Sequence, residues 1–106
     1  MAVFFETSVF TRRVTVLLSD DEYAELQRTL VAVPDAGDVI SGSGGLRKLR
    51  WGAKGRGKRG GVRVIYFHII SRDQFYMLLI YGKNEQDDLS PDQLRALKRS
   101  VEAIWQ

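Results

Sequence analysis

The chain has 106 residues, 44% of them hydrophobic, enough for one domain over residues 1–106 with a modest core, and too few for the two lobes of a protein kinase. It has no cysteine and a net charge of only +3, which excludes disulfides and gives no sign of an oxidising compartment. Its longest apolar stretch, residues 75–81, is too short to cross a membrane and residues 1–7 lack the pattern of a signal peptide, so we expect a soluble, cytoplasmic protein without a membrane partner.

The N-terminal third predicts one strand followed by two helices. Residues 2–7 are short and mostly apolar, as in a strand, and Thr7 is placed to cap a helix that runs to about Leu18. Ser19 and Glu22 then have the spacing of a capping box, in which each side chain satisfies a backbone amide of the other. Apolar residues recur at helical spacing after this box until a proline ends the second helix.

The rest of the chain predicts three strands and a last helix. Residues 37–45 have the composition of a loop. We expect the strands at residues 46–51, 62–70 and 74–82. Ser90 and Gln93 repeat the capping-box spacing before an amphipathic helix. The last three strands connect too briefly for helical crossovers, so the order β-α-α-β-β-β-α predicts an α+β fold: a small, mostly antiparallel sheet with helices packed on one side.

The basic residues crowd into one part of the chain. No acidic residue lies between Asp38 and Asp73, and this window holds nine of the sixteen lysines and arginines. A run of charge is often just a solvated face, but surfaces usually intersperse both signs because uncompensated repulsion destabilises the fold. A polyanion would relieve this repulsion, so nucleic acid is the favoured partner and an acidic protein is the main competitor.

Residues 51–61 of this window match two phosphate-loop patterns by coincidence. Gly55, Gly57 and Gly60, followed by Val62, have the spacing of the glycine-rich loop of a protein kinase, for which the chain is too short. Gly52, Gly57 and Lys58 have the spacing of a P-loop, but Arg59 stands where Ser or Thr would hold magnesium. A strand, and not a helix N-terminus, follows. We interpret the segment as an open cationic connector whose side chains meet the phosphates of a polynucleotide.

The predicted strands carry further cations. Period-two alternation over residues 46–51 puts Lys48 and Arg50 on one face and apolar side chains on the other. Arg63 is the exception in an otherwise apolar strand. A core-edge arginine paired with a carboxylate is the alternative for Arg63, but no acid lies near it in sequence. These side chains are therefore candidates for a phosphate-directed site.

Three segments together resemble a known family. GDVISGSGGLRKLRW, KGRGKRGGVRVIYF and FYMLLIYGKNE are similar to the HigB-type branch of the RelE/ParE superfamily, and the similarity spans essentially the whole domain. The resemblance implies the toxin of a type II toxin-antitoxin system: a ribosome-dependent endoribonuclease that cuts messenger RNA in the aminoacyl site. It also implies a cognate antitoxin, usually a HigA-like helix-turn-helix repressor, through which alone the toxin meets operator DNA.

This chemistry needs no metal and no cofactor, because RNA carries its own nucleophile, the 2′-hydroxyl. The enzyme must stabilise negative charge on the phosphorane and move two protons. Arg63 matches the family's arginine in its G-x-R-[ILV]-[ILV]-Y strand. The general base stays open among Lys48, Lys54, Lys58 and Lys83, since a lysine among other cations loses its proton more readily. We predict catalytic roles for Lys48, Arg50, Arg63 and Lys83, and contacts to RNA or the ribosome for Arg47, Lys54, Arg56, Lys58, Arg59 and Asn84.

The chain departs from the family pattern at two places. Asn84 stands where many members have an arginine, and Leu89 and Ser90 occupy the region of a functional tyrosine. Tyr81 is a candidate substitute, although an aromatic residue ending a buried strand is more often core. We interpret His68, the only histidine, as structural. Two other classes stay open: a ParE-like, non-catalytic inhibitor of gyrase and a non-catalytic RNA-binding module.

Overall fold

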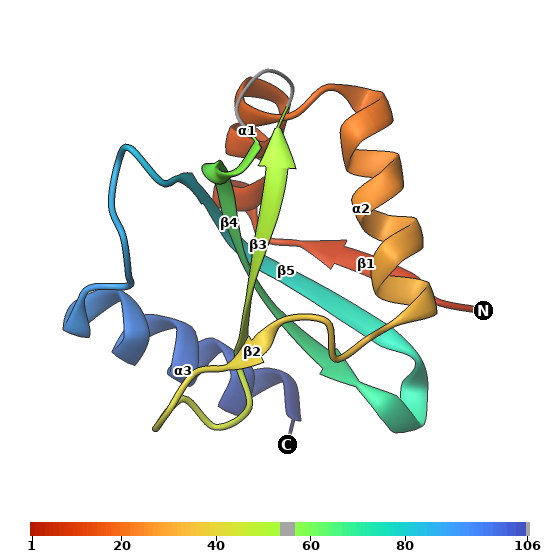
Figure 1. Ribbon diagram of the computed structural model, residues 1–106. Coiled ribbons are helices and arrows are strands. Elements are labelled where there is room, and N and C mark those ends of the chain that lie inside the picture. Colours follow the sequence, from red (N-terminus) through yellow and green to blue (C-terminus); the bar gives the residue numbers. More distant parts are fainter. Residues whose placement is uncertain (54–56, 106) are drawn as a thin grey trace.

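The computed structural model describes residues 1–53 and 57–105. Figure 1 shows three helices arranged around a twisted sheet. The elements are β1 (Val3–Glu6), α1 (Ser8–Leu17), α2 (Asp20–Ala32), β2 (Asp38–Val39), β3 (Arg47–Ala53), β4 (Gly57–Ile69), a short 3-10 helix (Ile70–Arg72), β5 (Gln74–Gly82) and α3 (Pro91–Trp105). No helix within the described ranges is long and apolar enough to span a membrane.

The sheet has five strands in the order β1-β5-β4-β3-β2. Strands β2 to β5 pair antiparallel, whereas β1 runs parallel to β5 at one edge. The predicted α+β class is confirmed, and the sheet is mixed through this one parallel pair. β2 was expected to be loop, because two residues, Asp38 and Val39, are too few to show an alternating pattern in sequence.

The helices cover both faces of the sheet and not the single face that was expected. One core joins α1 and α2 to Val62, Val64 and Tyr66 of β4, and a second core joins α3 to Ile65 and Phe67 of the same strand. Successive side chains of a strand point to opposite faces. A central strand that is apolar at every position therefore needs cover on both sides, and α3 supplies it on the second face.

The predicted helix starts are confirmed in atomic detail. The Thr7 hydroxyl accepts from the amide of Phe10 at 3.0 Å. The Ser19–Glu22 capping box is present, with hydrogen bonds of 3.1 and 2.8 Å. Ser90 and Gln93 repeat it at the start of α3 with bonds of 3.1 and 2.9 Å. The last box fixes where the connection between β5 and α3 ends.

Candidate active site

Two neighbouring strands bring basic residues to one face of the sheet, and a third strand adds a tyrosine beside them. Arg50 of β3 pairs directly with Arg63 of β4, and Arg63 pairs with Tyr81 of β5 on its other side. Directly opposite residues point to the same face, with Cβ atoms about 4.5–5.5 Å apart. Lys48 precedes Arg50 by two positions and shares that face. We call Lys48, Arg50 and Arg63 the cationic row.

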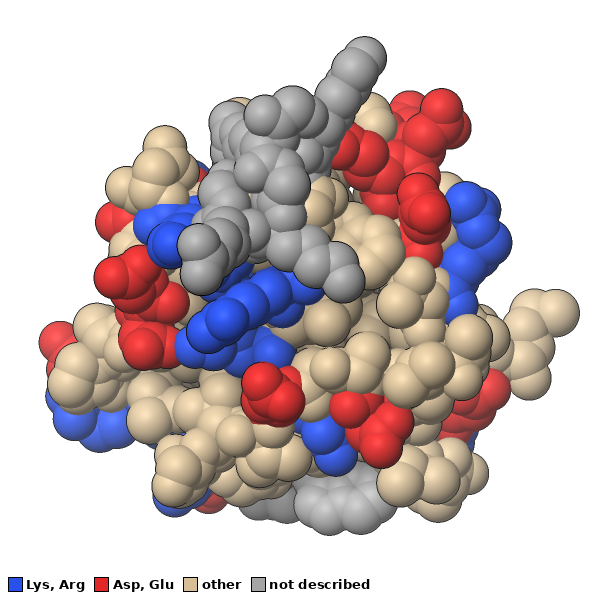
Figure 2. Space-filling view, viewed as in Figure 1, with Lys and Arg blue, Asp and Glu red and all other residues tan. Residues whose placement is uncertain are grey.

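Figure 2 shows where the charges gather on this side of the molecule. Lys and Arg side chains collect over the sheet beside β3, and acidic side chains border them toward the β5–α3 connection. Asp88 of that connection forms an ion pair with the Nζ of Lys48. The hydrogen bond and charge of Lys48, followed by the charges of Arg50 and Arg63, hold the pKa of Asp88 below its ordinary value. One carboxylate thus lies in the field of the whole cationic row.

The row runs from solvent into the protein. Arg50 is exposed, the Lys48 side chain is 21% exposed, and Arg63 is only 5% exposed. The Nη1 of Arg63 donates to the carbonyl of Val62 at 3.4 Å. Because charge interactions strengthen as water is excluded, the buried Arg63 can act on a bound phosphate more strongly than a surface cation.

Tyr81 of β5 lies beside Arg63 and is more deeply buried than any member of the cationic row. The residue is 2% exposed, and its hydroxyl has no hydrogen-bond partner among the described residues. Burial raises the pKa of Tyr81, as do the charges of Asp88 and Asp87, whereas the charge of Arg63 acts in the opposite direction. The phenol therefore stays protonated at neutral pH and can donate a hydrogen bond to an acceptor that enters the site.

A hollow of about 330 Å³ adjoins the row. Its polar lining includes Lys48, Arg50 and Asp88, and apolar side chains close the rest of its wall. These apolar residues are Val39, Ile40, Leu89 and Leu94. The cations thus border a concave space in which part of a ligand can lie, as binding sites usually require.

Lys83 and Asn84 follow directly after β5 and are exposed. The backbone amide of Lys83 donates to the carbonyl of Gly61 at 3.1 Å, which continues the pairing of β5 with β4 past Gly82. A Cβ at Gly82 would meet the Asn84 Oδ1 at 2.6 Å, so the amide side chain folds back over the strand end. Both residues stand at the rim of the site, two and three positions beyond Tyr81.

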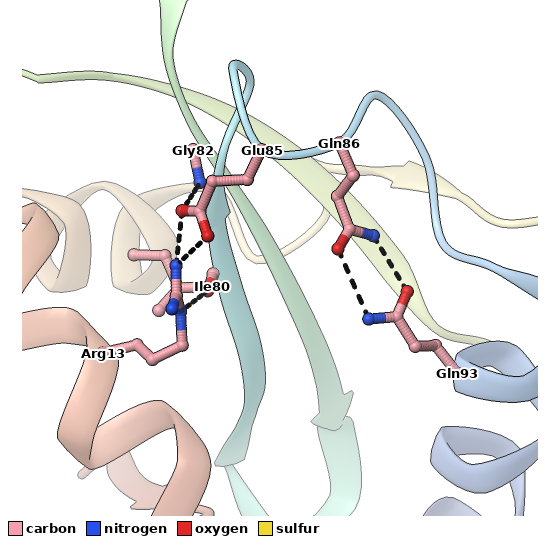
Figure 3. A network of polar contacts seen from close by, with 6 residues as sticks. All are labelled: Arg13, Ile80, Gly82, Glu85, Gln86 and Gln93. Carbon is pink, nitrogen blue, oxygen red and sulfur yellow. Dashed lines mark hydrogen bonds and ion pairs between the residues drawn. The ribbon is translucent and has the colours of Figure 1, made fainter.

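The turn that carries Lys83 and Asn84 is clamped to α1 (Figure 3). Arg13 donates to both carboxylate oxygens of Glu85 and, through its Nε, to the carbonyl of Ile80 at 3.2 Å. The same carboxylate accepts from the amide of Gly82 at 2.9 Å. Sequence reasoning missed this clamp because its two charged partners are 72 residues apart and neither belongs to a local pattern.

Arg47 is not part of the cationic row. It lies at the opposite strand parity from Lys48, beside Tyr66, and its Nη1 donates to the carbonyl of Gly37 at 2.7 Å. His68 is also remote: its ring stacks on Phe75 at 4.2 Å and its Nε2 lies 3.6 Å from Asp73. These contacts agree with a structural role for the histidine.

The connector is the remaining part of the predicted site, and it is not an open loop throughout, because β3 runs to Ala53 and β4 begins at Gly57. Lys54 and Arg56 lie outside the described residues, as do the side chains of Lys58 and Arg59. The structure therefore brings together Lys48, Arg50 and Arg63 with Lys83 nearby at the strand end, and it adds Tyr81 and Asp88 to them. Strand parity could have placed Tyr81 on this face, whereas nothing in the sequence indicates the contact of Asp88 with Lys48.

A comparison with protein families identifies the family to which the chain belongs. The model of the RelE toxin of the RelE/RelB toxin-antitoxin system matches residues 4–105, nearly the whole chain. The assignment to the HigB-type branch stays a prediction. A toxin of this kind has a cognate antitoxin as its partner. The chain belongs to the RelE toxin family and is the toxin component of a toxin-antitoxin system.

Proposed function

We propose that this toxin is a ribosome-dependent endoribonuclease that cuts messenger RNA in the aminoacyl site and so stops translation in the cytoplasm. The observation that carries the proposal is the direct pairing of Arg50 with Arg63, with Lys48 on the same face and a hollow beside them. Neighbouring like charges destabilise a sheet unless something compensates them. A phosphodiester would add negative charge beside this row and would be polarised by it.

The proposed reaction starts from the RNA itself. A base removes the proton of the 2′-hydroxyl, the 2′-oxygen attacks the adjacent phosphorus, and the bond to the 5′-oxygen breaks as an acid protonates that oxygen. The products are a 2′,3′-cyclic phosphate and a 5′-hydroxyl. Fixed cations can stabilise the additional negative charge of the phosphorane, so the reaction proceeds without a metal.

We assign these tasks according to how deeply each side chain is buried. Arg63, buried on β4, stabilises the phosphorane. Arg50 and Lys48 bind the phosphate from the solvent side. The proton of the 2′-hydroxyl goes to a lysine in its neutral amine form, either Lys83 at the end of β5 or Lys48, which then does not bind the phosphate as a cation. Tyr81, which keeps its proton, serves as a hydrogen-bond donor to a phosphate oxygen.

Contacts outside the row belong to the same proposal. The acid-free connector and its flanks would bind RNA or the ribosome through their positive charges, and the salt dependence of ribosome binding would report them. The residues concerned are Arg47, Lys54, Arg56, Lys58, Arg59 and Asn84. A HigA-like helix-turn-helix antitoxin would neutralise the toxin and carry it to operator DNA.

Cleavage on programmed ribosomes tests the function. We expect cuts in phase with codons, with a 2′,3′-cyclic phosphate on the upstream product and no cut when the nucleotide before the scissile bond is 2′-O-methylated. Arg63→Ala should lower the rate by about 10²–10³, the usual loss for one oxyanion donor. Arg28→Ala, which removes an exposed cation from α2 behind the other face of the sheet, is the matched control.

Two results would contradict the proposal. If ribosome-free RNA were cut as fast as ribosome-bound RNA, the cleavage would not depend on the ribosome. DNA breaks linked to gyrase without cleavage of messenger RNA would instead support the ParE-like alternative.

A further inference from the structure

The connection between β5 and α3 places an acid on the proposed phosphate site. The carboxylate of Asp88 bonds the Nζ of Lys48, and the two residues are 40 positions apart in the chain. A carboxylate and a phosphate both present negatively charged oxygen acceptors to an ammonium group. The contact that Asp88 makes is therefore the contact that a phosphodiester would need.

The deeper groups of the site are almost fully buried in this arrangement. Arg63 is 5% exposed and Tyr81 2% exposed. Asp88 lies close enough for its charge to act on Tyr81, and the charge of Arg63 acts on Asp88 in turn. Entry of a phosphodiester thus brings a second negative charge next to the carboxylate that already pairs with Lys48, and the two anions would repel each other.

The backbone around Asp88 is anchored on both sides. Before it, the Gln86 and Gln93 side chains exchange hydrogen bonds of 2.8 and 3.4 Å, and the Gln86 Nε2 also donates to the Asp88 carbonyl at 2.9 Å (Figure 3 draws the first two). After it, Ser90 caps α3. The Asp88 side chain itself is 76% exposed. Its carboxylate can therefore rotate into water by a side-chain motion alone, without unfolding the connection.

We propose that the Asp88 carboxylate occupies the position of an RNA phosphate on Lys48, so that RNA must displace it before a phosphodiester reaches Arg63 and Tyr81. The identity of the displacing polyanion as RNA rests on the proposed function. The acid is a built-in competitor: it lowers the affinity of the free toxin for stray polyanions. Only a substrate that makes additional contacts with the protein binds tightly enough to displace the Asp88 carboxylate from Lys48.

Binding of an uncleavable RNA tests the displacement. The probe is a fluorescent, fully 2′-O-methylated oligonucleotide, and its affinity for the full-length purified toxin is measured by anisotropy at low and at high salt. Asp88→Asn should bind about threefold to fivefold more tightly than the parent at low salt, the range expected for release of one exposed ion pair. The difference should shrink at high salt, because screening weakens the Lys48–Asp88 pair in the parent.

Asp87→Asn is the matched control. It removes the same charge from the neighbouring, exposed position, and its carboxylate does not bond Lys48 in the described structure. We expect its affinity to stay within about twofold of the parent, since only a general field is changed. Thermal unfolding of each variant confirms that the fold is intact.

The outcome is separable from that of the cleavage assay. An affinity for Asp88→Asn that equals or falls below that of the parent overturns the displacement model, and so does an equal gain in Asp87→Asn or a lack of binding in every variant. If Asp88→Asn gains affinity as stated while the parent toxin does not cut messenger RNA on ribosomes, the displacement model stands. In that case only the proposed nuclease activity fails.

Discussion

Arg50 and Arg63 lie directly opposite each other on β3 and β4, where their side chains share one face of the sheet. Like charges in this relationship destabilise a sheet by roughly 0.2–1 kcal/mol relative to a neutral pair. Arg50 is exposed, so replacing it opens no cavity in either core. The pairing therefore sets two like charges side by side at the site where we propose that phosphate binds.

The first prediction separates stability from activity at this pair. Arg50→Ala should leave the free energy of unfolding unchanged or raise it by up to about 1 kcal/mol, because the repulsion with Arg63 is removed. The same variant should cut ribosome-bound messenger RNA more slowly. Urea unfolding and the cleavage assay measure the two effects on one preparation. A loss of stability together with full activity would mean that Arg50 serves the fold and not the site.

The second prediction concerns the buried hydroxyl of Tyr81. Tyr81→Phe removes a polar group that has no hydrogen-bond partner among the described residues. Removing such a group is neutral or stabilising by up to about 1 kcal/mol, while cleavage should slow if the hydroxyl donates to a phosphate oxygen in the reaction. Thermal unfolding and single-turnover cleavage check both halves. Leu79→Ala, which shortens a half-buried side chain of the same strand and face, is expected to show the reverse pattern of lower stability and retained chemistry.

The third prediction follows from the lowered pKa of Asp88. Its pKa is depressed in the folded protein by Lys48 first and by Arg50 and Arg63 after it. A depressed carboxyl pKa contributes stability above the unfolded value of about 3.9, and this contribution is lost as the pH falls through the folded pKa. Because the Asp88 side chain is largely exposed, the contribution of its pair with Lys48 at neutral pH should be at most about 1 kcal/mol.

Urea unfolding at pH 7 and at a pH below about 3 measures this contribution. Asp88→Asn should be less stable than the parent by that amount at pH 7, and the two should converge at the acid end. A constant difference across the range would show that the variant acts through packing and not through the charge of Asp88.

Local sequence patterns predicted the strands and helices that carry this site, whereas long-range pairing determined which side chains meet in it. The Ser19–Glu22 box, the alternation that puts Lys48 and Arg50 on one face and the end of β5 at Gly82 are all properties of short segments. The position of Arg63 opposite Arg50 depends on the register of β3 with β4, which shifts between Trp51 and Ala53. A one-residue slip there would reverse the face of every side chain, so sequence alone could not decide it.

The contacts made by the β5–α3 connection were even harder to predict from the sequence. Asp88 meets Lys48 across 40 positions, and Glu85 meets Arg13 across 72. Both acids sit in a short polar segment that has no periodicity, and their partners depend on how α1 and β3 are placed by the two separate cores. The identity of the helix that covers each sheet face was likewise hidden, because apolar residues at both parities of β4 and β5 require cover without saying which helix supplies it.

The last prediction concerns the clamp between Arg13 and Glu85. Glu85 joins α1 to the end of β5 by accepting from the Arg13 guanidinium and from the amide of Gly82. Glu85→Gln keeps the shape and one acceptor oxygen but removes the charge, so we expect a loss of about 0.5–1 kcal/mol, since both partners are more than a third exposed. Glu85→Ala also leaves the Gly82 amide without its acceptor, and it should cost about 1 kcal/mol more.

The turn that these bonds hold carries Lys83 and Asn84 at the rim of the site. Hydrogen exchange at the Gly82 and Lys83 amides should therefore accelerate in both variants, more in the alanine variant, while amides in the centre of β4 change only with global stability. Unchanged exchange at Gly82 in Glu85→Ala would show that β5 and not the clamp orders this turn, and the lysine at its tip would then be positioned by the sheet alone.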